Sequence, residues 1–181
     1  MKIASSYEAL SRMLDYPQEK RALQDDYAIV REGVGDLADD CSLPAFRDFI
    51  AASELTTLQE EYVATFDFNP ATSLYLGHHL FGDNQKKSGY MIGLKQEFSR
   101  YGYCPVGNEL PDHLSVVLGF LAFLSEGEKS DERRSLIAKL VLPGVERLNA
   151  AFASKQDSPW RPILEAVQLL CTADCKEVPS C

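Results

Sequence analysis

The chemically richest segment of the sequence is Glu109-Leu110-Pro111-Asp112-His113-Leu114, directly before an apolar run over residues 115–124. Two carboxylates and an imidazole in one short segment could hold a ligand or exchange a proton. Pro111 suits the first position of a helix, because its missing N–H needs no partner there. Asp112 would then lie in the first turn, where the positive end of the helix favours an anion. We predict a polar cluster, with Glu109 just before it, at the mouth of a helix that runs through the core.

Catalysis is the least favoured of three interpretations of this cluster. A base and the group that orients it need side chains that converge, whereas those of the neighbours Asp112 and His113 diverge. The sequence contains no Gly-x-Ser-x-Gly nucleophile motif and no Gly-x-x-x-x-Gly-Lys-Ser/Thr phosphate-binding loop. Helix capping, or ligand binding by Glu109 and its neighbours, explains the residues better than acid–base chemistry. We therefore expect no enzymatic activity.

A metal site is not expected either. His78 and His79 are adjacent, so on a helix their side chains point about 100° apart, and the sequence has no His-Glu-x-x-His motif. Cys171, Cys175 and Cys181 form one loose cluster, whereas a zinc site normally has two close pairs of ligands. The role of these three thiols stays open.

A second polar segment, Phe66-Asp67-Phe68, follows a predicted helix. Tyr62 and Phe66 fit the helical apolar spacing of residues 55–66, and we predict that both belong to the core. Asp67 and Phe68 lie beyond them, where the chain leaves the helix. Exposed aromatic rings beside carboxylates suit an amphipathic peptide with a basic end.

The apolar patterns indicate helices throughout, and no alternating segment predicts a strand. The predicted helices lie around residues 7–14, 43–50, 55–66, 74–81, 90–101, 115–124, 136–152 and 160–170. Pro143 must kink or divide the seventh of these. We predict an all-α fold, a single-domain bundle of about eight to ten helices over residues 1–181, with residues 172–181 as a flexible tail.

Charge and cysteine content exclude several classes of protein. The chain has 27 acidic and 18 basic residues, a formal charge of -9, whereas a nucleic-acid-binding protein needs a basic face. No apolar run reaches the roughly 18 residues of a membrane-spanning helix, and the N-terminus lacks the apolar region of a signal peptide. Five cysteines, an odd number in a chain without an export signal, indicate reduced thiols in the cytoplasm.

Several motifs together resemble a known family. In order, they are Glu61-Tyr62-Val63-Ala64-Thr65-Phe66-Asp67, Ser73-Leu74-Tyr75-Leu76 with Phe81-Gly82, Met91 with Leu94, and Glu109-Leu110-Pro111-Asp112-His113-Leu114. This order resembles the NarJ branch of the redox-enzyme maturation chaperones, a family that includes TorD and DmsD. The resemblance covers roughly residues 5 to 172.

The resemblance implies a TorD-like, all-helical chaperone that works in the cytoplasm and catalyses nothing. Such a protein binds the N-terminal tail of the catalytic subunit of a nitrate reductase or related molybdoenzyme. It assists insertion of the bis-guanine-dinucleotide molybdenum cofactor into that subunit and holds no cofactor stably itself. By the family's pattern, Glu109, Pro111, Asp112 and His113 line or support the tail-binding groove. Asp67 and the loop up to Tyr75 are expected to contribute to the same region.

Two alternatives to a chaperone remain. The same fold could serve as a permanent helical accessory subunit, of the delta type, in the same enzyme complex. An enzyme or nucleotide-binding protein is disfavoured, because the sequence lacks a phosphate-binding loop and a catalytic constellation. We expect a monomer, with a dimer as the alternative, and neither nucleic-acid binding nor membrane insertion.

Overall fold

Helices form most of the described chain, which in the computed structural model comprises residues 3–35, 42–127, 129–154 and 157–176. The α-helices are α1 (Ile3–Met13), α2 (Lys20–Val34), α3 (Leu43–Ala52), α4 (Leu55–Tyr62), α5 (Leu76–Phe81), α6 (Lys86–Tyr101), α7 (Leu114–Glu126), α8 (Ser130–Leu136), α9 (Leu142–Ala151) and α10 (Arg161–Lys176). Two π-helical turns, Val63–Asp67 and Ile137–Val141, and two 3-10 turns, Pro70–Thr72 and Phe152–Ser154, lie between them. Pairing between extended segments is limited, over these ranges, to one bridge between Tyr75 and His113. The prediction of an all-α fold is confirmed.

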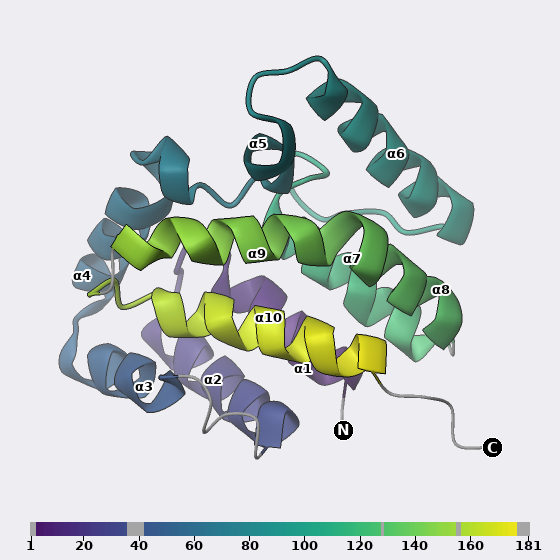
Figure 1. Cartoon of the computed structure of the whole chain (residues 1–181). Coiled ribbons are helices and arrows are strands. Elements are labelled where there is room, and N and C mark those ends of the chain that lie inside the picture. Colours follow the sequence, from purple (N-terminus) through teal and green to yellow (C-terminus); the bar gives the residue numbers. More distant parts are fainter. Residues whose placement is uncertain (1–2, 36–41, 128, 155–156, 177–181) are drawn as a thin grey trace.

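α7 is buried along most of its length and packs against α1 and α8. α1 packs against α7 and α2, while α9 packs against α10 and α5. Figure 1 shows α9 and α10 side by side, with α1 to α3 below them and α6 at the upper edge of the molecule. Every residue of α7 from Leu114 to Leu118 is buried. The predicted course of this helix through the core is therefore confirmed.

A cluster of aromatic rings joins the first half of the chain to α10. The ring of Trp160, directly before α10, lies 5.1 Å from that of Phe46, 5.4 Å from that of Tyr62 and 5.7 Å from that of Phe66. Large rings packed at these separations, mostly edge to face, bury much apolar area and interact favourably beyond that burial. Tyr62 and Phe66 belong to the core, as predicted.

Glycine and proline set several helix ends at the predicted places. Gly102 ends α6 in the left-handed region, with φ of 73°, a conformation that glycine adopts without the steric strain of other residues. Pro143 lies in the first turn of α9 and has no N–H to continue the preceding helix. The chain before it widens into the second π-turn, which interrupts the α-helical pattern between α8 and α9, in agreement with the predicted kink or division at Pro143.

The helix predictions were wrong near both ends of the chain. α2 was missed, because its buried stripe of Leu23, Val30 and Val34 is narrow and charged residues surround it. The tail predicted over residues 172–181 is helical up to Lys176, where an ion pair between buried Asp174 and Arg133 fixes the last turns of α10. Residues 177–181 lie outside the described ranges. None of the helices within those ranges combines the length and the apolar character needed to cross a membrane.

Candidate peptide-binding surface

The predicted site segment forms an extended turn before α7. The helix begins at Leu114, so the predicted start at Pro111 is wrong. Leu114 N–H donates to the carbonyl of Leu74 at 2.8 Å, and Leu76 N–H donates to the carbonyl of Asp112 at 2.9 Å. These bonds hold the two segments extended side by side, and the helix starts only after them.

The Asp112 side chain holds α5 against this turn through a hydrogen bond and does not cap α7. Its side chain is 0% exposed, and its Oδ2 accepts a hydrogen bond from Gly77 N–H at 3.1 Å. No donor within the described ranges reaches its Oδ1. Gly77 allows this close approach, because a Cβ there would lie 2.7 Å from Oδ2. Asp112 and the buried Pro111 therefore lie beneath the surface and support it from below.

Three other predicted site residues meet above this turn. The Tyr75 hydroxyl donates to Glu109 Oε2 at 2.9 Å. The Tyr75 ring lies edge-on to the His113 ring, with centroids 5.1 Å apart. His113 is 5% exposed, and its Nδ1 lies 2.7 Å from the Ser115 hydroxyl. Tyr75 and Glu109 thus face solvent, and His113 lies directly below them.

The electrostatics of this cluster are negative. Partial burial, and then the negative charge of Glu109, raise the pKa of Asp67. Burial and the bond to Glu109 raise the pKa of Tyr75 to about 12. Burial lowers the pKa of His113 despite the opposing effect of Glu109, Asp15 and other nearby carboxylates. The imidazole is therefore mostly neutral at pH 7, and the exposed carboxylates are left without a counter-charge from it.

Three loops bring the same pair of groups to this region, a carboxylate followed by an exposed large apolar side chain. The pairs are Asp15-Tyr16, Asp67-Phe68 and Glu109-Leu110, whose apolar members are 39%, 83% and 47% exposed. All three carboxylates lie close enough to His113 to favour its charged form. We call these three pairs, together with Tyr75, the acidic–apolar surface. Its composition suits a segment that carries both basic and apolar side chains.

The sequence analysis missed Asp15 and Tyr16. They lie in the connection between α1 and α2, far along the chain from the other members of the surface. The sequence contains a pattern that could have indicated these two residues, because Asp15-Tyr16 precedes Pro17 much as Asp67-Phe68 precedes Asn69-Pro70. Two acidic–aromatic pairs at helix exits could have been compared from the sequence alone.

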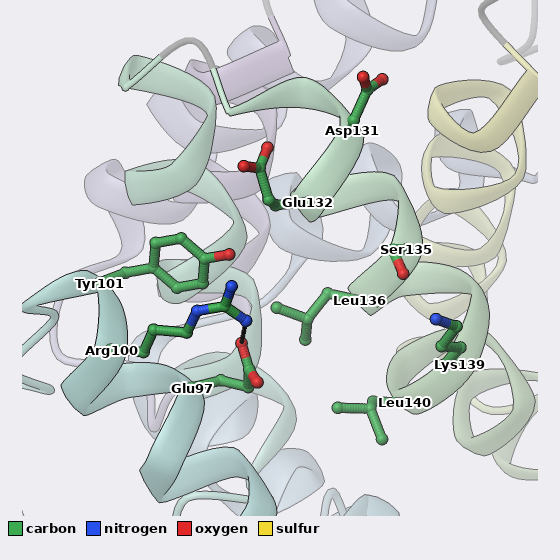
Figure 2. A pocket seen from close by; sticks show the side chains of 9 residues that line it. All are labelled: Glu97, Arg100, Tyr101, Asp131, Glu132, Ser135, Leu136, Lys139 and Leu140. Carbon is green, nitrogen blue, oxygen red and sulfur yellow. Dashed lines mark ion pairs between the residues drawn. The ribbon is translucent and has the colours of Figure 1, made fainter.

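A hollow of about 560 Å³ lies elsewhere, between α6 and the chain of α8 and the second π-turn (Figure 2). No predicted site residue lines it. Its charges are mixed, since Arg100 pairs with Glu97 at 3.8 Å and Lys139 faces the same hollow as Glu132. Such a site does not favour one sign of charge, in contrast to the acidic–apolar surface.

Among the described residues, the thiols are not clustered with other ligands in a way that would bind a metal. In the part of the chain that the structure describes, no three His, Cys, Asp or Glu side chains are arranged to hold an ion. Burial raises the pKa of Cys171 to about 12, so this thiol stays protonated. Cys175 is half-buried, and Cys181 lies outside the described ranges.

Comparison with known proteins identifies the family. The sequence profile of the family described as nitrate reductase delta subunit matches residues 35–166, most of the chain. The chain belongs to the nitrate reductase delta subunit family. A family relative from Bacillus subtilis, named as a probable nitrate reductase molybdenum cofactor assembly chaperone NarJ, is 29% identical over 163 residues, which cover 90% of this chain and 85% of the relative.

Other matches agree with this assignment. The NarJ nitrate reductase molybdenum cofactor assembly chaperone of Escherichia coli is 29% identical over 138 residues, covering 74% of this chain and 58% of that protein. A crystal structure from Archaeoglobus fulgidus, described as that of a redox enzyme maturation protein, matches with a TM-score of 0.53 and 23% identity. It covers 85% of this chain and 92% of the other, and it supports the fold of the delta subunit family. The resemblance to the NarJ branch is thus confirmed.

Proposed function

We propose that this member of the delta subunit family is a cytoplasmic chaperone for the catalytic subunit of a nitrate reductase or a related molybdoenzyme. It binds the N-terminal tail of that subunit on the acidic–apolar surface and keeps the subunit competent until its molybdenum cofactor has been inserted. In this role the chain performs no catalysis and binds no cofactor stably.

The observation that carries the proposal is the meeting of three acidic–apolar pairs at one surface of a protein whose relatives are named as assembly chaperones. A disordered tail loses conformational entropy when it binds, so its affinity is moderate and its release is easy. The carboxylates of Asp67 and Glu109 attract a basic tail, and the exposed side chains of Phe68 and Leu110 offer it apolar contacts.

The test is capture of the client from cells. Tagged protein purified from cells grown by anaerobic nitrate respiration should retain the molybdoenzyme catalytic subunit, identified by mass spectrometry. Charge reversal by Asp67→Lys with Glu109→Lys should abolish this retention, because both side chains would then repel a basic tail.

A matched control is Glu132→Lys, which makes the same kind of change in the hollow of Figure 2, away from the surface. It should leave capture unchanged. Capture of no oxidoreductase by the wild-type chain would contradict the proposed function. Equal capture by the charge-reversed and wild-type proteins would contradict the proposed surface.

A permanent accessory subunit is the second candidate, favoured by the family's description as nitrate reductase delta subunit. The two roles differ in stoichiometry. A chaperone should be absent from the purified mature enzyme and present with the catalytic subunit before assembly. Recovery of one copy of this chain per mature enzyme would favour the subunit role.

A further inference from the structure

A second, smaller hollow adjoins the acidic–apolar surface. It has a volume of about 350 Å³ and lies between the α1–α2 connection, α4 and the first π-turn. Its lining residues are Tyr16, Thr56, Gln59, Glu60, Val63, Ala64 and Phe68. Two of them, Tyr16 and Phe68, are the exposed rings of the acidic–apolar surface, so the hollow and the surface are continuous.

The first π-turn shapes this hollow. Phe68 N–H donates to the carbonyl of Val63 at 3.0 Å, five residues back, so this turn is wider than an α-helical one. The Thr65 carbonyl instead accepts from the Thr72 hydroxyl, which stabilises the wide turn. Ala64, on the exposed side of the turn, has only a methyl group to fill the space. π-turns inside helices are frequent at functional sites.

The charge around the hollow is negative, and this limits what can occupy it. Its lining contains Glu60 and no basic residue. Three hollows elsewhere in the described chain each contain an arginine, Arg100, Arg133 or Arg161. A partner that places an apolar side chain here therefore meets carboxylates beside it and gains most if basic groups flank that side chain.

We propose that the hollow holds an apolar anchor side chain of the client segment while the basic groups of that segment lie against Asp67 and Glu109. This inference rests on the proposed function and adds the chemistry of the client: a large apolar residue flanked by arginine or lysine. Full burial of one large apolar side chain strengthens binding by about tenfold or more. Segments with this pattern dock in grooves as amphipathic helices.

The first test fills the hollow with a larger side chain. Ala64→Phe adds a ring from the exposed side of the π-turn, and Ala138→Phe makes the same change at an exposed position of the second π-turn, away from the surface. The probe is a fluorescein-labelled peptide with the N-terminal sequence of the nitrate reductase catalytic subunit from the same organism. We expect Ala64→Phe to bind it at least about tenfold more weakly and Ala138→Phe to bind it as wild type does. Thermal melting should show that both variants stay folded.

A second probe addresses the anchor directly. A peptide whose large apolar residues are replaced by serine should bind wild-type protein weakly and should be insensitive to Ala64→Phe. Equal binding of the unmodified peptide by wild type and Ala64→Phe overturns the inference and leaves the proposed function intact. If Ala64→Phe changes the oligomeric state of the protein while peptide binding stays unchanged, the inference is overturned, and the occupant of the hollow is a second copy of this chain. Failure of wild-type protein to bind the unmodified peptide contradicts the proposed function itself.

Discussion

At the scale of single residues, Asp112 orders the surface without reaching it. Removing its carboxylate by Asp112→Ala leaves the buried Gly77 N–H without an acceptor, which costs about 1–3 kcal/mol of stability. The variant should also bind the client peptide more weakly, because Tyr75 and Glu109 lose the fixed backbone below them. Asp112→Asn keeps an oxygen for Gly77 N–H and should retain most of both properties. Denaturant unfolding and peptide titration of the two variants measure these effects.

Two glycine variants provide the control for this role of Asp112. Gly77→Ala would place a methyl group 2.7 Å from Asp112 Oδ2 and 3.2 Å from Lys87 Cγ, so it should destabilise the protein and weaken peptide binding together. At Gly89, in the neighbouring helix α6, an added methyl group would have no atom within 4 Å. Gly89→Ala should therefore stabilise the protein by up to about 1 kcal/mol. Equal stability of the two variants would show that close contact at Gly77 does not position Asp112.

At the scale of elements, a buried ion pair ties α10 to α8 and α1. Asp174 accepts hydrogen bonds from Arg133 Nε at 2.7 Å, from Arg133 Nη2 at 2.8 Å and from the Tyr7 hydroxyl at 3.0 Å. Asp174→Ala leaves the buried guanidinium without this carboxylate, and we expect a loss of about 3–5 kcal/mol. Chemical denaturation gives the loss, and hydrogen exchange should show the last turns of α10 opening first.

The double variant Arg133→Met with Asp174→Leu separates charge burial from packing. A buried ion pair replaced by apolar side chains of similar size is often neutral for stability. The double variant should therefore recover most of the stability lost in Asp174→Ala. If it is no more stable than the single variant, the hydrogen bond from Tyr7 or the fit of the side chains matters more than the paired charges.

Helices that pack a broad apolar stripe could be predicted from the sequence, and so could their ends at Gly82 and Gly102. Elements that depend on contacts distant in sequence could not. The end of α10 looked like a frayed tail, because the buried partner of Asp174 lies 41 residues away. The start of α7 was misplaced for the same reason, since Leu74 and its neighbours, and not the local Pro111 signal, decide where the helix begins.

The candidate site, like the fold, was only partly predictable from the sequence. The sequence placed Glu109, Asp67 and Tyr75 in one region through the family resemblance, and the structure brings Tyr75 and Glu109 into direct contact. The sequence could not reveal that the Asp112 side chain points inward to Gly77, because the direction of this side chain depends on the backbone pairing with residues 74–76. The sequence could not place Asp15 either, since the position of α1, which precedes it, depends on packing against α7, a helix distant in sequence.

At the scale of the whole molecule, the formal charge of -9 and the three local carboxylates act on a basic client at different distances. Raising the salt concentration from about 0.1 M to about 1 M shortens the screening length from about 10 Å to about 3 Å. We expect affinity for the client peptide to fall about tenfold over this range, mainly through a slower association rate. Stopped-flow fluorescence with the labelled peptide measures both rates.

Variants decide which charges produce this effect. The double variant Asp67→Asn with Glu109→Gln removes two local negative charges, and the formal charge of the chain changes only from -9 to about -7. If the charge of the whole molecule set the salt dependence of binding, that dependence would stay nearly the same in this variant. We expect it to become clearly weaker instead, because at about 0.1 M salt the screening length of about 10 Å already removes most of the attraction of distant carboxylates, so the attraction that further salt removes comes from the neighbouring ones. Ala64→Phe should bind weakly with the salt dependence of the wild type, since it removes an apolar contact and no charge. An unchanged salt dependence in the doubly neutralised variant would assign the attraction to the overall field of this acidic protein.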